Sequence, residues 1–460
     1  MTSCKPADAA TDPAEGAGSQ STWYVLATLV AIYAFAHLDR QILSLLVEPL
    51  KHDLHLSDTG ISLLQGFAFA LFMAAAGLPI GRLVDAGRRT PILAAGILTW
   101  GLTTMGCGFA SSFAGLMALR MGVGAGEAVL TPSAHSIIAE AAPEKRLGLA
   151  LGLFGIGSYI GGGLAFILGA FILVGVEHLG PVHLGWPGTF KYWQLVFLAV
   201  GAPALPMALW ALSLPEPRRP GRVQEMDRSI RAGVEFFRTH YAGMGLVNLT
   251  GGFTAVALYA ASAWFPTFVV RTFHWTASAA GIGYGLVVMV CGAVGVVGGG
   301  LLGDFAVARG HASGRLMAMG ATAACAVPFA CVAPLMPTPW SSFLLLAPAT
   351  LFITMALGLL PSVQQAIVPN HLRGSASALG TLMVNLVGLG LGPTCVALAS
   401  DHLFDTPVAV GRSLALVAPL ALLIAAGCAA AGLRPYARSL AVNSKAGYGC
   451  VPMMDYAETS

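Results

Sequence analysis

The sequence predicts an all-α polytopic membrane protein, with twelve transmembrane helices in two pseudo-symmetric six-helix bundles. Three observations predict this fold: the apolar composition, twelve apolar runs of membrane-spanning length, and a repeat between the two halves of the chain. Of the 460 residues, 56% are apolar and only 10% are charged, whereas a soluble domain carries about 25% charged residues. The composition therefore excludes a soluble enzyme and a disordered chain. The net charge of +3 gives no reason to expect nucleic acid as a partner.

A membrane-spanning helix needs about 20 mostly apolar residues. Charged residues, Gly and Pro divide the chain into twelve runs of at least this length. In chain order, the predicted spans cover residues 23–50, 58–84, 90–110, 113–140, 146–174, 190–213, 241–270, 277–307, 314–335, 340–367, 373–400 and 409–433.

The sharpest break in this pattern separates the sixth run from the seventh. Residues 215–240 hold six Arg residues against four acidic residues, which predicts a basic cytoplasmic linker between bundles at 23–214 and 241–433. We expect residues 1–22 to form a disordered cytoplasmic segment and residues 434–460 a cytoplasmic tail. No cleaved signal peptide is expected, because the N-terminal segment lacks a basic region ahead of a short apolar core.

The basic residues predict the orientation, since loops rich in Lys and Arg stay on the cytoplasmic side. With the N-terminus inside, 18 of the 24 Lys and Arg residues are cytoplasmic and four are external. The opposite orientation would place the Arg-rich linker outside. We therefore expect both termini in the cytoplasm and the protein in the plasma (inner) membrane.

The two predicted bundles also share short sequence matches in the same order. The pattern Gly-x-Leu-x-Asp covers residues 81–85 at the end of the second run, and it returns 219 residues later at residues 300–304. Ser57 and Thr276 stand at the same offset, and each is a plausible helix N-cap. A duplicated six-helix unit is typical of transporters, which hold one site between two movable halves.

Four charged residues lie near the middle of predicted spans: Asp39 and Arg40 in the first, and Arg120 and Glu127 in the fourth. Each costs at least about 2.5 kcal/mol in the bilayer, so we expect them to face a cavity and one another. In antiparallel helices, the two carboxylates would lie at a similar depth. Such a network changes its pairing with protonation and would couple conformational exchange to protons. A static quartet that only fixes helix packing is the alternative.

The second half has no charged residue in mid-span, and its polar side chains there are neutral. We expect them either to orient a substrate or to bind neighbouring helices. In the first half, Gln65 and His37 are further candidates for lining a cavity, and His37 would alternatively join a proton path. The neutral candidates of the second half are Asn248, Thr254, Tyr259, Trp264, Gln364 and Asn385.

No HExxH, GxSxG or Walker A motif occurs in the sequence. We therefore expect no enzyme activity, no metal site and no cofactor, with a proton gradient as the driving force. A membrane enzyme and a transporter-like receptor are the alternatives from other functional classes.

With these features, the chain resembles the major facilitator superfamily over essentially all of its spans. The segment 81–89 is similar to the family's signature between helices two and three, although it is one residue shorter and lacks the basic residue after the Asp. The resemblance implies that this loop latches the two halves at the cytoplasmic face, with Asp304 as a weaker second copy. The residues assigned to this gate are Gly81, Asp85, Arg88, Arg89 and Asp304.

A narrower resemblance is to the Spinster-like branch, which is carried by LDR at 38–40, LLQ at 63–65, RMGVGAGEA at 120–128 and GFTAV at 252–256. It implies a secondary active, proton-coupled transporter that moves a lysolipid or sphingoid-type amphiphile by alternating access. Helices one, four, seven and ten would line the path. Proton-coupled symport of a small organic anion is the alternative, because a buried Arg suits either kind of anion. We expect the protein to be a monomer in the lipid bilayer.

Overall fold

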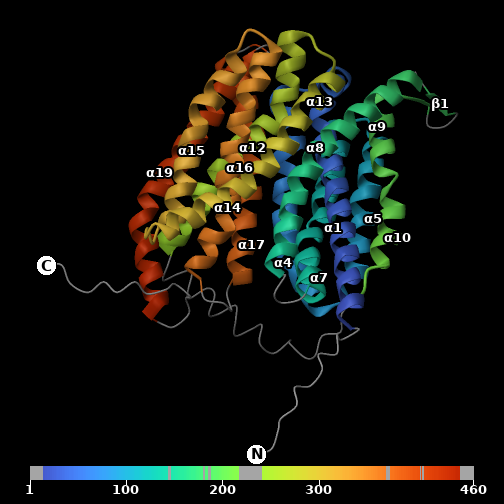
Figure 1. The fold of residues 1–460 in the computed structure, drawn as a ribbon. Coiled ribbons are helices and arrows are strands. Elements are labelled where there is room, and N and C mark those ends of the chain that lie inside the picture. Colours follow the sequence, from blue (N-terminus) through green and yellow to red (C-terminus); the bar gives the residue numbers. More distant parts are fainter. Residues whose placement is uncertain are drawn as a thin grey trace, which may run out of the picture.

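The computed structural model describes residues 14–142, 147–179, 182–184, 188–216, 241–368, 373–404, 406 and 409–445. Within these ranges, twelve helices are long and apolar enough to cross a membrane. This confirms the predicted all-α fold with twelve spans. The helices run side by side along one axis, and the N-terminal and C-terminal halves lie next to each other (Figure 1).

The N-terminal half contains the first six spans, and its second span includes a π-helical turn, η1. A short antiparallel hairpin, β1 (Val182–Leu184) and β2 (Gly188–Phe190), connects the fifth and sixth spans. In chain order, the helices are α1 (Ala14–Leu45), α2 (Val47–Leu54), α3 (Asp58–Ser62), η1 (Leu63–Phe67), α4 (Ala68–Ala86), α5 (Arg89–Cys107), α6 (Phe113–Glu127), α7 (Leu130–Ala141), α8 (Leu147–Leu179), α9 (Tyr192–Gly201) and α10 (Ala204–Leu212).

The C-terminal half contains the other six spans, and three of its turns are π-helical (η3, η6 and η7). In chain order, the helices are α12 (Tyr241–Phe273), α13 (Ala277–Val287), η3 (Val288–Gly292), α14 (Ala293–Ala308), α15 (Gly314–Val332), η4 (Ala333–Leu335), α16 (Pro339–Ala366), α17 (Arg373–Met383), η6 (Val384–Leu389), α18 (Gly390–Leu398), η7 (Ala399–Leu403) and α19 (Val410–Lys445).

Helices α1 and α19 show how the ends of the bundle are arranged, since α1 begins and α19 ends at the same end (Figure 1). We call this the inner end, following the predicted orientation, and the opposite end the outer end. Of the predicted linker at 215–240, residues 217–240 lie outside the described residues, as do residues 1–13 and 446–460.

Local sequence explains where several helices begin or break. Ser57 Oγ accepts a hydrogen bond from the Gly60 N–H at 3.1 Å, and Thr276 Oγ1 accepts one from the Ala279 N–H at 3.2 Å, which confirms both predicted N-caps. In the fourth span, the chain breaks between α6 and α7, directly after the last residue of α6. Pro132 explains this break, because it has no N–H to donate to the carbonyl four residues earlier and its ring collides with that carbonyl.

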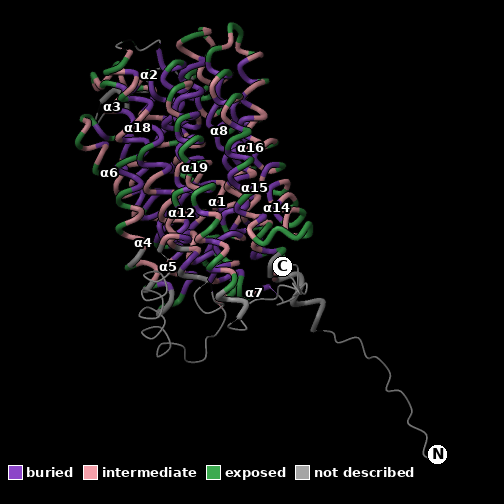
Figure 2. The backbone as a smooth tube through the Cα atoms, turned by 90° about the vertical axis from the view of Figure 1, so that its left-hand side faces the viewer, coloured by how far each residue is buried: buried purple, intermediate pink, exposed green. Residues whose placement is uncertain are grey.

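Among the described residues, buried apolar side chains form two clusters, of which one joins the halves. The first cluster includes Phe166 from the N-terminal half together with Trp264 and Tyr284, which lie toward the outer ends of their helices. The second contains residues of the C-terminal half, such as Met319 and Leu359. The apolar core is thus continuous between the halves toward the outer end. Exposed residues cover the bundle along its length, as expected for helices surrounded by lipid (Figure 2).

The Glu216 carboxylate, just after α10, caps the first turn of α5. Its Oε1 accepts a hydrogen bond from the Arg89 N–H at 2.8 Å, and its Oε2 accepts from the Thr90 N–H at 2.9 Å and from the Thr90 hydroxyl at 2.6 Å. Partial burial raises the pKa of Glu216, but these hydrogen bonds and the Arg89 charge outweigh burial and hold the pKa below its ordinary value. The cap therefore contributes stability above the ordinary carboxyl pKa, and this contribution is lost as the pH falls through the lower pKa of the folded state.

We expect Glu216→Ala to lower the free energy of unfolding by about 1 kcal/mol, the usual cost of removing a helix cap. Thermal denaturation near neutral pH measures this loss as a lower Tm, and the difference between the two proteins should shrink at a pH below the carboxyl pKa. Glu216→Gln is the matched control, since it keeps one acceptor oxygen and should retain part of the stability. An unchanged Tm in Glu216→Ala at neutral pH would contradict the capping role.

Candidate functional site

The four charged residues predicted in mid-span form two buried ion pairs between α1 and α6. The Asp39 carboxylate accepts a hydrogen bond from the Thr104 hydroxyl at 2.5 Å, and its other oxygen lies 3.9 Å from Nη1 of Arg120. Arg40 Nη2 donates to Glu127 Oε2 at 2.5 Å. All four side chains are at most 9% exposed. The structure thus brings together the four residues that the sequence predicted. Asp39 and Arg120 are fully buried within the N-terminal half, whereas Arg40 of the second pair also lines a small cavity between the halves.

Phe69, on α4, lies against both arginines of these pairs. The guanidinium carbon of Arg40 is 4.7 Å from the centroid of the Phe69 ring, and that of Arg120 is 5.6 Å from it. An aromatic face attracts a cation, and more strongly where water is excluded. Phe69 therefore helps to hold two cations in one dry site. This role could not be predicted from the sequence, because Phe69 is one of many apolar residues in its span.

Several polar atoms of the site have no hydrogen-bond partner, although they are buried. Among the described residues these include Nη1 and Nη2 of Arg120, Oδ1 of Asp39, Oε1 of Glu127 and both amide atoms of Gln65. Buried polar groups are nearly always paired in proteins. These donors and acceptors can therefore bind water or a ligand, or they can pair differently among the four charged side chains.

The π-helical turn η1 contributes to the site through its backbone and through Gln65. The Leu64 carbonyl, within η1, accepts a hydrogen bond from Nε of Arg120 at 3.4 Å. Single π-helical turns within α-helices occur often at functional sites. Here the turn presents a backbone acceptor and the Gln65 amide on the same side as the ion pairs.

Two glycines of the 120–128 string allow α6 to pack closely against its neighbours. A Cβ atom at Gly124 would lie 2.6 Å from the carbonyl oxygen of Phe69, and one at Gly126 would lie 2.6 Å from the backbone nitrogen of Trp100. Any larger residue would push α6 away from α4 and α5. These glycines therefore fix how deeply the charges of α6 sit within the half.

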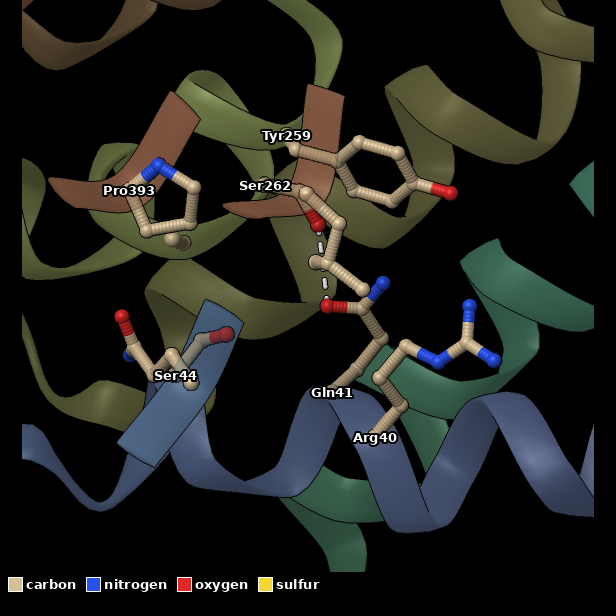
Figure 3. Close-up of a pocket in the computed structure, with 9 residues that line it drawn as sticks. Arg40, Gln41, Ser44, Tyr259, Ser262 and Pro393 are labelled. Atoms are coloured by element: carbon tan, nitrogen blue, oxygen red, sulfur yellow. Dashed lines mark hydrogen bonds between the residues drawn. The ribbon is translucent and has the colours of Figure 1, made fainter. Parts of the chain in front are cut away.

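A small cavity lies beside Arg40 at the interface of the halves (Figure 3). Its volume is about 10 Å³, which is room for about one water molecule. Across it, the Ser262 hydroxyl donates to Oε1 of Gln41 at 2.9 Å. Of the predicted cavity residues, Gln65 and Tyr259 line it. Ser44 also lines it and was not predicted, although its position one helical turn after Arg40 could have identified it.

Most of the other predicted polar residues in the C-terminal half bond within that half. The Gln364 amide donates to Oδ1 of Asn248 at 2.8 Å, and the Trp264 ring N–H donates to a backbone carbonyl of α18 at 2.9 Å. The Thr254 hydroxyl donates to a carbonyl one turn earlier in α12 at 2.7 Å. Asn385 is buried in η6. In this conformation, the four hydrogen-bonded side chains therefore stabilise helix packing, and their contact with a substrate stays a prediction.

His37 lies on α1, one turn before Arg40, and is partly buried. Its Nδ1 is 2.9 Å from the Tyr33 carbonyl oxygen, and its ring packs edge-on against the Tyr33 ring. This geometry holds the imidazole against its own helix. A role in a proton path stays a prediction.

At the inner end, Arg89 contacts α7 of its own half. It forms an ion pair with Glu140, and its Nη1 donates to the Ser136 carbonyl at 3.4 Å. Arg89 is only 2% exposed. These contacts of Arg89 join helices within the N-terminal half, and its part in a latch between the halves stays a prediction.

The other predicted gate residues surround this contact or lie on the second copy of the motif. Gly81 lies on α4 next to open space, and Arg88 is the exposed residue just before α5. The side chain of Asp85 lies outside the described residues. Asp304 accepts a hydrogen bond from Nη2 of Arg315 at 2.9 Å, also within one half.

At the outer end, Arg271 of α12 joins the two halves. Its Nη1 and Nη2 donate to the two oxygens of Asp58 at 2.8 and 2.9 Å, and its Nε donates to Oε1 of Glu48 at 2.6 Å. Asp58 is fully buried and also pairs with Lys51. A forked arginine–carboxylate pair of this kind is among the strong polar contacts in proteins.

A second contact lies nearby, where Oδ2 of Asp401 accepts hydrogen bonds from the N–H and the hydroxyl of Thr59, both at 2.7 Å. Sequence reasoning missed this outer contact surface. Arg271 is one of the four Lys and Arg residues predicted to be external, and Asp58 is the first residue of the second predicted span. Neither position by itself predicts a partner. Two oppositely charged residues at the outer ends of the second and seventh spans were the available signal.

The arrangement offers charges and proton-binding groups rather than a reactive centre. Among the described residues, no group of three or more His, Cys, Asp or Glu side chains could hold a metal ion. The paired arginines can bind an anion once their carboxylates release them, and the carboxylates can then bind protons.

Comparison with known proteins places the chain among membrane transporters. The sequence model of the family described as Major Facilitator Superfamily matches residues 29–393. An MFS-type efflux pump of Mycolicibacterium smegmatis is 28% identical over 439 residues, which cover 91% of this chain and 94% of that protein. A probable galactarate/D-glucarate transporter of Bacillus subtilis is 26% identical over 320 residues, covering 63% of this chain and 66% of that protein.

Among solved structures, a bacterial homologue of the human lysosomal transporter Spinster has a similar fold. In its inward-facing and unoccupied conformation, the TM-score is 0.74 at 26% identity, covering 92% of this chain and 98% of that chain. In its inward-facing and occupied conformation, the TM-score is 0.70, covering 96% of this chain and 100% of that chain.

Proposed function

This chain belongs to the major facilitator superfamily, and we propose that it is a proton-coupled transporter of an anionic substrate that works by alternating access. Its relatives and its fold make it a Spinster-like secondary transporter rather than an enzyme. Proton coupling, the substrate, the cytoplasmic termini and the plasma (inner) membrane are parts of the proposal.

One observation carries the proposal: the ion pairs Asp39–Arg120 and Arg40–Glu127 are buried in the middle of the bundle and are incompletely paired. A buried charge that loses its partner is costly. Protonation of Glu127 would therefore release Arg40 toward the small cavity between the halves, where an anionic group can replace the lost carboxylate. Proton binding then raises the affinity for the substrate, and substrate binding raises the affinity for the proton.

Alternating access is supported by the asymmetry between the two ends of the bundle. The outer end is joined by Arg271 with Asp58 and by Asp401 with Thr59. The apolar core that the halves share lies toward the same end. Contacts concentrated at one end suit a state that opens toward the other end, and an exchange of contacts would then reverse the opening.

We propose an amphiphile with an anionic head, such as a lysophospholipid or a sphingoid phosphate, as the substrate. The Spinster-like fold supports this choice, and the anionic head would meet Arg40 and the unpaired amide of Gln65. A small sugar acid is the second candidate, because proteins named as galacturonate and galactarate/D-glucarate transporters are among the relatives. Both substrates present an anion to the same cation.

A ligand screen by thermal shift tests the proposal, with the purified full chain, lysophosphatidate, sphingosine phosphate, galacturonate and galactarate at two pH values. We expect stabilisation by the amphiphiles that grows at the lower pH. Gln65→Leu removes an amide that has no hydrogen-bond partner in the described part of the chain, so the variant should fold normally. It should raise the apparent Kd about tenfold, since a hydrogen bond to a charged group contributes about 1.5 kcal/mol. Thr99→Val, on the exposed side of α5, is the matched control. Stabilisation by sugar acids alone would replace the amphiphile with the second candidate, and no response to any anion would overturn the proposal.

A further inference from the structure

A second, larger cavity lies at the outer end of the bundle, between the two halves. Its volume is about 520 Å³, which is within the range of small-molecule sites. The N-terminal half contributes the ends of α1 and α8 together with α2, and the C-terminal half contributes the end of α12 and the start of α13. We call this cavity the outer vestibule. Its lining includes Glu48, Leu173, Glu177, Tyr192, Thr267 and Trp275.

The charge of the outer vestibule is negative. Glu48 and Glu177 line it, and among the described residues none that lines it is Lys, Arg or His. Glu48 shares Arg271 with Asp58. Glu177 is exposed, and in the described part of the chain no ion pair involves it. The vestibule therefore presents at least one carboxylate whose charge no neighbouring cation balances.

The remaining lining suits the apolar and polar parts of an amphiphile. Leu173 and Val270 are apolar, and Tyr192 and Trp275 are aromatic side chains of the kind that attract a cation. Thr267 is only 3% exposed, and within the described ranges its hydroxyl has no hydrogen-bond partner. A buried hydroxyl without a partner is unfavourable, so a ligand that donates to it would gain a contact that the protein leaves open.

We propose that the outer vestibule binds a cationic amphiphile, an alkylammonium whose head meets Glu177 and Thr267 and whose chain lies against the apolar lining. This ligand is distinct from the anionic substrate. Because the vestibule is built from both halves, it exists in this form only while the outer end is closed. A bound ligand therefore stabilises the outer-closed state and acts as an inhibitor of the exchange between states.

Binding is tested by thermal-shift titration of the full chain with octylammonium, octyltrimethylammonium and octanoate, each below its critical micelle concentration. We expect octylammonium to bind, octyltrimethylammonium to bind more weakly because it cannot donate to Thr267, and octanoate not to bind. Glu177→Gln should raise the Kd of octylammonium about threefold to fivefold, as expected for a partly exposed ion pair. Thr267→Val should raise it for octylammonium alone.

Arg309→Gln is the control for a distant change of charge, since Arg309 is exposed at the inner end and belongs neither to the vestibule nor to the predicted gate, and it should leave the Kd unchanged. Spin labels at His52→Cys and Pro337→Cys, both exposed at the outer end, measure the state of the protein. Octylammonium should increase the population with the short distance between these labels. Equal binding of octanoate, or an unchanged Kd in Glu177→Gln, would overturn the proposal. Neither result depends on which anion the protein transports.

Discussion

Glu127→Gln is expected to abolish the pH dependence of the conformational equilibrium and to lower the free energy of unfolding by about 3–5 kcal/mol. The reason is that Arg40 would remain buried without its counter-ion, and breaking a buried ion pair carries a cost of this size. Spin labels at positions 52 and 337 measure the equilibrium over a range of pH. Denaturant titration in mixed micelles measures the stability.

The double variant Arg40→Gln/Glu127→Gln separates coupling from packing. It removes both charges, so we expect it to recover most of the lost stability, because no unpaired charge remains. It should nevertheless stay insensitive to pH at the labelled positions. If the double variant keeps the pH response of the wild type, the quartet only fixes helix packing and the proposed coupling is wrong.

Arg271→Gln is expected to open the outer end. Asp58 is fully buried and would keep only Lys51 as a partner, and Glu48 would lose its cation. A loss of about 3 kcal/mol from a buried pair shifts an equilibrium by roughly a hundredfold. We therefore expect the distance between labels at positions 52 and 337 to change from mainly short to mainly long.

The control is Arg412→Gln, which removes an exposed arginine near the outer end of its span. In the described part of the chain, Arg412 takes part in no ion pair. Asp401→Asn breaks the second outer contact and should produce a smaller change in the same direction. Unchanged distances in both Arg271→Gln and Asp401→Asn would show that these contacts do not hold the outer end closed.

The contacts between the halves at the outer end could not be predicted from the charged residues there. A charged residue at the end of a span has an ordinary role in setting topology, and that role does not require a partner. Arg271 and Asp58 are 213 positions apart in the chain, so no local pattern connects them. Phe69 and Ser262 were missed for a related reason, since apolar and hydroxyl side chains are common throughout membrane helices.

The sequence by itself determined the twelve spans, the division into halves, the N-caps at Ser57 and Thr276 and the identity of the four mid-span charges. These features follow from constraints that act locally, because every stretch of about 20 residues must satisfy the bilayer and its own backbone hydrogen bonds. Only the tertiary structure decided that Arg40 pairs with Glu127, that Asp39 lies against Arg120 and Thr104, and that Arg271 closes the outer end. Such pairings depend on the rotation and separation of helices, which the close approach of α6 at Gly124 and Gly126 and the packing of the two halves set together.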